Sequence, residues 1–149
     1  MKKILILGAS SDIGFTLLKN MASKDYIIGA HCNSNHKKLE TYIKKNKLEK
    51  KIRIFKANLN SQNSCHTLVK KFYKWTKKID LLVQLNGNVS KVTNWKLLKQ
   101  RDFEKDINSN LASAFFVAQK VFEKMEKSGG KIILMSTSSA LHGGGENSL

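Results

Sequence analysis

A glycine-bounded turn near the N-terminus contains the residues best suited to bind phosphate. The turn Gly8–Gly14, with the sequence GASSDIG, follows directly on the apolar run Ile4–Leu7. Such a run, too short for a helix and followed by a turn and an amphipathic segment, predicts a strand, a tight loop and a helix N-terminus. A helix N-terminus offers unpaired backbone N–H groups and the positive end of its dipole. Glycine at the start of the turn lets the backbone approach a pyrophosphate without a side chain between them. We therefore expect phosphate contacts from Gly8, Ser10, Ser11, Asp12, Ile13 and Gly14, although glycines six apart also occur in ordinary strand-to-helix turns.

Short polar residues follow four further apolar runs. In a parallel sheet flanked by helices, ligands bind beyond the carboxyl ends of the strands. We therefore predict that these polar segments form one rim with the glycine turn. The apolar runs are Tyr26–Ala30, Ile52–Phe55, Leu81–Leu85 and Lys131–Met135, and the polar segments behind them are His31–Asn35, Ala57–Asn60, Asn86–Asn88 and Ser136–Ser139.

Helical patterns fill the gaps between these runs. Most runs are continuous rather than alternating, as expected for parallel strands covered on both faces. Strict alternation of strand and helix predicts an α/β fold, a doubly wound parallel sheet with right-handed crossovers. No linker divides the chain, so residues 1–149 are expected to form a single domain that ends in a loop-like tail from Gly143 to Leu149. The predicted apolar helix faces are Ile13, Leu17, Leu18 and Met21; Leu68, Val69, Phe72 and Trp75; and Ile107, Leu111, Ala114, Phe115, Ala118, Phe122 and Met125, with a weaker helix over Lys37–Lys47.

The chain is strongly basic, with 149 residues and a formal net charge of +16. Such a charge suggests a nucleic-acid partner, because clustered Lys and Arg neutralise phosphates. However, only Arg53 and Arg101 among the 27 basic residues are arginines, the side chains best matched to phosphate and base contacts. The lysines are spread through every predicted helix. We therefore expect a solvated lysine surface and no specific nucleic-acid binding.

Composition and cysteine usage predict a cytoplasmic protein with no metal site. No apolar run approaches the length of a membrane span, and no small-residue cleavage site follows the N-terminal run. Cys32 and Cys65 are expected to be free thiols. A metal site at His31, Cys32 and His36 is disfavoured, because no second pair of ligands has suitable spacing.

In their order and spacing, these motifs resemble those of the short-chain dehydrogenase/reductase family over the whole chain. Gly8–Gly14 is similar to the family's Thr-Gly-x3-Gly-x-Gly turn, with Leu7 in place of the threonine and Asp12 in place of the middle glycine. The resemblance implies a Rossmann-like sheet of strand order 3-2-1-4-5, whose further C-terminal strands are missing from this chain. Three later segments match family motifs: Asn58 and Leu59 match the segment that borders the adenine ring, Gln84–Gly87 stands in place of Asn-Asn-Ala-Gly with cofactor contacts expected at Asn86 and Gly87, and Gly130–Thr137 matches the fifth strand.

The end of the second predicted strand favours NADP(H) over NAD(H) as the cofactor. An acid there would accept hydrogen bonds from the ribose hydroxyls and repel a 2′-phosphate. The chain has His31, Cys32 and Asn33 instead, followed by the basic segment His36–Lys38. We expect His31 and Asn33 to contact the cofactor. The basic residue expected inside the glycine turn is absent, since Ser11 stands there.

The resemblance implies hydride transfer between a nicotinamide and a carbonyl or alcohol substrate, with a Tyr-x3-Lys pair supplying the proton. Thr137 falls at the position of the family's catalytic hydroxyl, with Ser138 as the alternative. Asn110 falls at the position of the family's catalytic helix asparagine. The alternative role for this serine-rich segment is hydrogen bonding to loop backbone.

The chain resembles roughly the first three-fifths of a family member. Its literal Tyr-x3-Lys match, Tyr73 to Lys77, lies on the helix before the fourth strand, whereas the family's pair follows the fifth, so we interpret it as two neighbours on a helix. Counting from Thr137 places the family's tyrosine at or beyond Leu149. We therefore expect these residues alone to be poorly stable and inactive, with an exposed fifth strand. The long helix Asp102–Lys127, a dimerisation element in the family, would lack its partner helix.

Three functions follow from these observations. The leading hypothesis is an NADP-preferring reductase, as a whole protein a homodimer or homotetramer, that acts on a carbonyl such as a 3-oxoacyl thioester or a sugar-like ketone. One alternative is a non-catalytic nucleotide-binding module, which would use no tyrosine. The other is a basic nucleic-acid-binding protein, which would show steeply salt-dependent binding.

Overall fold

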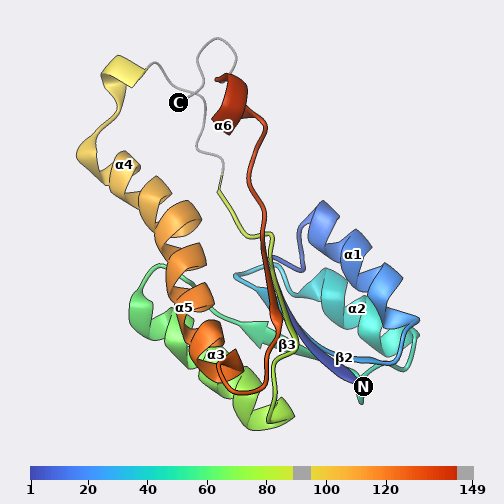
Figure 1. Ribbon diagram of the computed structural model, residues 1–149. Coiled ribbons are helices and arrows are strands. Elements are labelled where there is room, and N and C mark those ends of the chain that lie inside the picture. The colour runs from blue at the N-terminus through green and yellow to red at the C-terminus, as the bar shows by residue number, and fades with distance from the viewer. Residues whose placement is uncertain (89–94, 144–149) are drawn as a thin grey trace.

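A five-stranded sheet lies between two layers of helices in the computed structural model, which describes residues 1–88 and 95–143 (Figure 1). The tail that the sequence predicts as a loop lies outside the described residues, except for Gly143. The strands are β1 (Lys2–Leu7), β2 (Tyr26–Cys32), β3 (Ile52–Lys56), β4 (Leu81–Gln84) and β5 (Lys131–Leu134). The helices are α1 (Asp12–Ala22), α2 (Lys37–Lys45), α3 (Gln62–Thr76), the 3-10 turn η1 (Trp95–Leu97), α4 (Gln100–Asp106), the π-helical turn η2 (Ile107–Ala112), α5 (Ser113–Met125) and α6 (Ser139–His142).

The sheet is parallel throughout, and its strand order is β3-β2-β1-β4-β5, as the sequence predicts. Ile6 in the central strand pairs with Ala30 on one side and with Val83 on the other. Strict strand-helix alternation and right-handed crossovers account for this order. Because all five strands run the same way, their carboxyl ends meet at one edge of the sheet.

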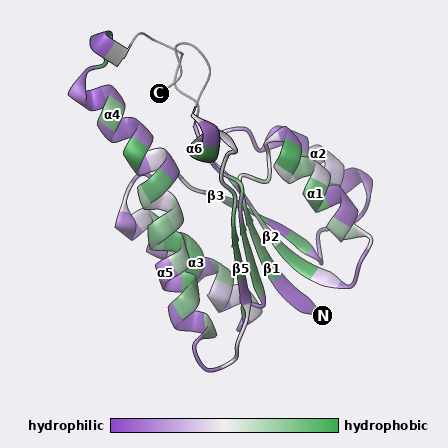
Figure 2. Cartoon of the chain, turned by 45° about the horizontal axis from the view of Figure 1, so that its top comes forward, coloured by the Kyte–Doolittle hydropathy of each residue, from purple (hydrophilic) through white to green (hydrophobic). Residues whose placement is uncertain are grey.

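Both faces of the sheet are buried, which explains why the predicted strands are continuous apolar runs. Successive side chains of a strand point to opposite faces, so Ile4 and Ile6 face α1 and α2 while Leu5 and Leu7 face α3 and α5. Figure 2 shows the hydrophobic strands between these two pairs of helices. The first face packs with Leu18, Ile28, Leu39 and Ile43, and the second with Phe55, Leu68, Val69, Phe72, Val117 and Val121.

Helix α5 buries only part of the face that its apolar periodicity predicts, since Ala118 and Met125 of that face pack against the core. The buried residues of α5 are Ser113, Val117, Val121 and Met125. By contrast, Leu111, Phe115 and Phe122, which the sequence predicts on the core face, are 64%, 58% and 64% exposed. Two apolar stripes run along this helix, so a helical repeat alone does not tell which of them meets the sheet. Ile13 on α1 is also predicted on an apolar core face, but it is 65% exposed.

Strand β5 forms an edge of the sheet and exposes apolar side chains, as expected from the sequence. Ile133 is 48% exposed, and Leu134 and Met135 are each 53% exposed. Ile132 alone on this strand packs against the core that α3 and α5 cover. Within residues 1–88 and 95–143, no helix is both long and apolar enough to span a bilayer.

Candidate nucleotide-binding site

A cavity of about 690 Å³ opens beyond the carboxyl ends of β2, β3 and β4. Its far wall comes from α4 and the π-helical turn, which contribute Arg101, Lys105 and Asn108. Leu59 reaches it from the buried core, whereas Asn33 and Asn58 are exposed. The cavity brings together six predicted cofactor residues, His31, Asn33, Asn58, Leu59, Asn86 and Gly87. The glycine turn, Asn110, Thr137 and Ser138 lie outside its lining.

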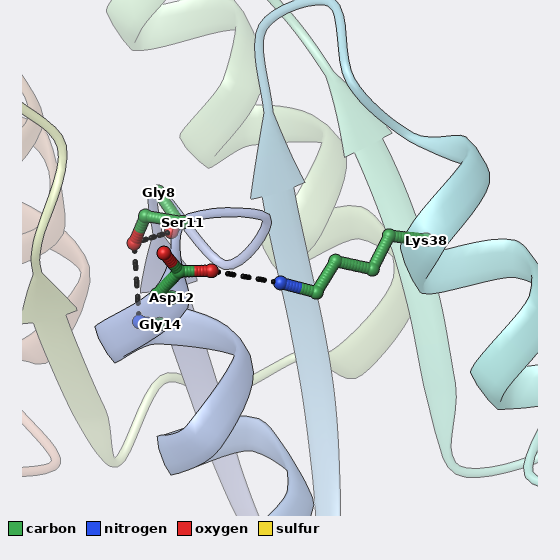
Figure 3. Close-up of polar contacts among 5 residues, drawn as sticks. All are labelled: Gly8, Ser11, Asp12, Gly14 and Lys38. Carbon is green, nitrogen blue, oxygen red and sulfur yellow. Dashed lines mark hydrogen bonds and ion pairs between the residues drawn. The ribbon is translucent and has the colours of Figure 1, made fainter.

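Ser11 caps the helix that follows the glycine turn (Figure 3). Its hydroxyl donates to the carbonyl oxygen of Gly8 at 2.8 Å and accepts from the N–H of Gly14 at 3.1 Å. The first N–H groups of a helix have no acceptor within the helix. After this cap, the N–H groups of Asp12 and Ile13 remain, and the described residues supply no acceptor for them. The turn therefore presents free donors and a helix dipole to an anion.

Both ends of the turn require glycine because other backbone atoms approach too closely for a side chain. A Cβ at Gly14 would lie 2.2 Å from the carbonyl oxygen of Gly8. Gly8 itself has a φ of 73°, and a Cβ there would lie 2.8 Å from the backbone nitrogen of Asn86. The space beside Gly8 is thus filled by the segment after β4.

Asp12 stands in place of the middle glycine of the Thr-Gly-x3-Gly-x-Gly motif. It forms an ion pair with Lys38 of α2 (Figure 3). The Lys38 Nζ lies 3.0 Å from Asp12 Oδ1 and 4.5 Å from the centre of the Phe15 ring. The carboxylate is fully exposed, so the pair adds little to the free energy of folding. It nevertheless places one ammonium group from the α2 segment directly beside the glycine turn.

His31 is buried and uses both ring nitrogens within the protein. The N–H of Gly8 donates to Nδ1 at 3.2 Å, and Nε2 donates to the carbonyl oxygen of Ala57 at 3.0 Å. The side chain is 3% exposed, and this burial lowers its pKa below the usual histidine value. His31 thus joins the glycine turn to the segment after β3.

The two cysteines are buried free thiols, as the sequence predicts. Burial raises the pKa of Cys32 and that of Cys65, so both thiols are protonated near neutral pH. Among the described residues, no group of three or more His, Cys, Asp or Glu side chains has a geometry that could hold a metal ion.

Two amides fix the segment that follows β4. The Gln84 side chain donates to the carbonyl oxygen of Asn86 at 2.5 Å and accepts from the N–H of Met135 at 3.2 Å. The Asn86 Nδ2 donates to the Ser113 hydroxyl at 2.9 Å, and that hydroxyl donates to the carbonyl oxygen of Ser109 at 2.7 Å. The Asn86 Oδ1 is buried and has no hydrogen-bond partner among the described residues.

Asn110 lies in the π-helical turn and holds the same segment from the other side. Its Oδ1 accepts from the N–H of Asn88 at 2.7 Å, and its Nδ2 donates to the carbonyl oxygen of Asn88 at 3.0 Å. A primary amide paired with both backbone groups of one residue fixes that residue's position and orientation. Asn110 therefore positions the loop that borders the cavity.

Thr137 and Ser138 lie in the exposed segment between β5 and α6. The Thr137 hydroxyl accepts from the N–H of Ser139 at 3.3 Å, which is the loop-satisfying role that the sequence leaves as an alternative. Tyr73 and Lys77, the literal Tyr-x3-Lys match, lie at the C-terminal end of α3. There the N–H of Lys77 donates to the carbonyl oxygen of Tyr73. That end of α3 leads into the start of β4 and therefore lies opposite the rim of strand ends.

Sequence reasoning missed the roles of Gln84 and Ser113, and it missed the ion pair of Lys38 with Asp12. Gln84 and Ser113 each make two side-chain hydrogen bonds. Lys38, which the sequence singles out only as part of a basic segment, reaches the glycine turn from α2. For Gln84 a signal was present, since it is a polar residue at the end of an apolar run and therefore needs a buried partner. No local pattern indicates the partners of the other two.

Comparison with known proteins supports the fold. The family model described as short chain dehydrogenase matches residues 2–149. Over 140 residues the chain is 34% identical to "3-oxoacyl-[acyl-carrier-protein] reductase FabG" of Rickettsia prowazekii (strain Madrid E), which covers 91% of this chain and 54% of that protein. The chain thus spans about half the length of the curated relatives it matches.

Two solved structures have the same fold. NADH-dependent reductase A1-R′ complexed with NAD superposes with a TM-score of 0.86 at 19% identity, covering 97% of this chain and 62% of that one. ElxO with NADP bound superposes with a TM-score of 0.83 at 23% identity, covering 94% of this chain and 57% of that one. At these identities the two structures support the fold, and they contain different dinucleotides.

Proposed function

The chain belongs to the short chain dehydrogenase family, and we propose that it binds NADP(H) along the rim of strand ends as the cofactor-binding part of a reductase. The observation that carries this proposal is the glycine turn, whose cap leaves the N–H groups of Asp12 and Ile13 free. The turn contacts His31, which lines a cavity of about 690 Å³. When bound, the nicotinamide supplies the hydride that is exchanged with a carbonyl or alcohol. In this proposal, the phosphates contact the glycine turn, from Gly8 to Gly14, and Asn33, Asn58 and Leu59 contact the adenosine half.

Lys38 supports NADP(H) as the preferred dinucleotide. Its ammonium group lies beside the glycine turn, and no acid follows β2 to repel a 2′-phosphate. On cofactor binding, the 2′-phosphate would replace Asp12 as the partner of Lys38. Because Asp12 is fully exposed, water compensates for the loss of that ion pair at little cost.

The proposed substrate is a carbonyl compound of the 3-oxoacyl thioester class. The support is the 34% identity to a 3-oxoacyl-[acyl-carrier-protein] reductase. Thr137, or Ser138 next to it, would donate a hydrogen bond to the carbonyl oxygen. In the proposed role, Asn110 would hold a water molecule in the proton relay, in addition to its contacts with Asn88.

The positions of the three tyrosines support the proposal that these 149 residues bind the cofactor but lack the proton donor for catalysis. Tyr26 begins β2, Tyr42 lies on α2 and Tyr73 lies on α3, so none of them follows β5. We therefore propose that the 149-residue chain binds the dinucleotide and does not turn over substrate.

The test is NADPH oxidation measured with a 3-oxoacyl thioester, by the 149-residue chain and by a version extended with the coding sequence downstream of Leu149. We expect turnover only in the extended protein, and only where the extension supplies a Tyr-x3-Lys pair. Turnover by the 149-residue chain would contradict the assignment of the proton donor. An extended protein with that pair, folded and loaded with NADPH but inactive, would favour a non-catalytic module.

A further inference from the structure

His31 connects two segments that the proposed cofactor site requires. Its Nδ1 lies 3.2 Å from the backbone nitrogen of Gly8, and its Nε2 lies 3.0 Å from the carbonyl oxygen of Ala57. Its own carbonyl oxygen accepts from the N–H of Ala9 at 2.8 Å. The first two residues of the glycine turn are thus both held by His31, one through its side chain and one through its main chain.

Only one protonation state of the ring satisfies both side-chain hydrogen bonds. A backbone N–H is always a donor, so Nδ1 must be the unprotonated acceptor toward Gly8. A carbonyl oxygen is always an acceptor, so Nε2 must bear the hydrogen toward Ala57. A second proton on Nδ1 would place two N–H groups against each other at the Gly8 contact.

Gly8 transmits this constraint to the groups that would meet a phosphate. Its carbonyl oxygen accepts from the Ser11 N–H at 3.0 Å and from the Ser11 hydroxyl at 2.8 Å. The same hydroxyl caps Gly14 and so sets the direction of the free N–H groups at the start of α1. Gly8 has little room to move away from the ring, because the backbone of Asn86 packs against its other side.

We propose that His31 is a positioning residue for the glycine turn, and that protonation of its Nδ1 in acid releases Gly8 and weakens dinucleotide binding. The inference rests on the proposed cofactor role of the turn. It assigns to His31 a function beyond the cofactor contact that the sequence predicts, because its ring nitrogens already have protein partners. The turn should therefore be fully formed at neutral pH and lose order as the pH falls.

The surroundings of His31 support a neutral ring at neutral pH. The ring is buried, and burial lowers its pKa below 6.5. The direction of the pH effect follows from this shift. Above the pKa of His31 in the unfolded chain, the ring is neutral in both the folded and the unfolded chain. As the pH falls through the lower pKa of the folded chain, the ring gains a proton and the Gly8 contact is lost. The titratable or charged groups around it are Cys32 on β2, Lys56 on β3, Asp12 paired with Lys38 near the turn, and Arg101, Glu104 and Lys105 across the cavity.

Two substitutions separate the two hydrogen bonds of the ring. His31→Asn keeps an acceptor near Nδ1 and loses the donor to Ala57, whereas His31→Gln keeps a donor near Nε2 and loses the acceptor for Gly8. Neither side chain titrates near neutral pH. His142→Asn is the matched control, because His142 is an exposed histidine on α6 and lies outside the proposed cofactor contacts.

The experiment measures the Kd of NADP⁺ by calorimetry from pH 8 to pH 5 for the unaltered chain and the three variants. NADP⁺ is used because it is stable in acid, and the titration of its own 2′-phosphate near pH 6 affects every variant equally. Relative to His31→Asn, the unaltered chain should lose affinity as the pH falls below the midpoint of the His31 titration that NMR reports, by up to about tenfold once the ring is charged, as expected for one lost hydrogen bond. His31→Gln should bind weakly at pH 8, and His142→Asn should follow the unaltered chain. Parallel pH profiles for the unaltered chain and His31→Asn would overturn the proposal.

Nitrogen NMR of the histidine rings tests the same geometry without a ligand and without a variant. We expect the neutral ring of His31 to bear its hydrogen on Nε2, and the amide resonance of Gly8 to shift with the midpoint of the His31 titration. A ring protonated on Nδ1 at neutral pH would overturn the proposal. So would a Gly8 amide whose chemical shift does not change as His31 titrates. Absence of binding of both NADP⁺ and NAD⁺ at pH 8, with these NMR signatures present, would instead refute the proposed function.

Discussion

At the residue scale, the glycine turn combines an anion-binding backbone with an acidic side chain. The free N–H groups of Asp12 and Ile13 attract phosphate, whereas the Asp12 carboxylate repels it. Lys38 compensates for this repulsion because its ammonium group lies 3.0 Å from the carboxylate. In the proposed role, the preference of the turn for one dinucleotide would depend on a cation from α2, a different helix from the one that begins at the turn.

Replacing this cation should change the discrimination between the two dinucleotides. Lys38→Met should raise the Kd of NADP⁺ about tenfold, because it removes a charge-assisted contact with the 2′-phosphate, and should leave the Kd of NAD⁺ nearly unchanged. Lys37→Met is the control, since Lys37 is an exposed neighbour on the same helix. Calorimetric titration with both dinucleotides measures the ratio. Equal losses for NADP⁺ and NAD⁺, or an equal effect of Lys37→Met, would refute the role of Lys38.

At the element scale, the segment from α4 through the π-helical turn to α5 forms one wall of the cavity and also covers the sheet. The π-helical turn Ile107–Ala112 contains Asn110 and Ser109, whose contacts fix the loop after β4. π-helical turns within longer helices often occur at functional sites. Here the turn directs the Asn110 amide toward the backbone of Asn88.

The sequence predicts the strands and the rim well, because both depend on local patterns. Five apolar runs followed by polar residues predict the parallel sheet and six residues that line one cavity, and the family resemblance adds the order of the strands. The buried face of α5 is predicted only in part, because Phe115 and Val117 belong to two apolar stripes of similar strength and only the packing of the sheet distinguishes them. The inward orientation of His31 is missed for a related reason, since its partners Gly8 and Ala57 are far away in the sequence.

Strand β5 should make the isolated chain self-associate, because edge strands offer unpaired backbone groups and this one also exposes apolar side chains. Ile133→Lys places a charge on a side chain that is 48% exposed and should therefore reduce association with little loss of folding stability. Phe122→Lys, on the exposed face of α5, is the comparison that separates the strand from the helix. Light scattering during size-exclusion chromatography reports the mass. A mass that falls only with Phe122→Lys would assign association to the helix.

At the scale of the whole molecule, the net charge of +16 attracts any polyanion, so binding of a dinucleotide must be distinguished from general electrostatic attraction. Exposed charges are screened beyond about 8 Å at physiological salt, whereas contacts within a formed site are screened much less. A binding measurement at 0.15 M salt, with a variant that alters only the turn, makes this distinction. Gly14→Ala is such a variant, because its Cβ would lie 2.2 Å from the carbonyl oxygen of Gly8.

Calorimetric titration of the 149-residue chain with NADP⁺ at neutral pH and about 0.15 M salt tests the cofactor site most directly. We predict saturable binding of one NADP⁺ per chain, lost in Gly14→Ala and retained in Gly129→Ala. The second variant controls for backbone strain, because Gly129 has a φ of 67° but lies at the opposite end of the sheet, where no other atom is within 4 Å of the added Cβ. Circular dichroism checks that both variants fold. Absence of binding to the unaltered, folded chain, or equal binding by a folded Gly14→Ala variant, would contradict the assignment of the glycine turn as the dinucleotide site.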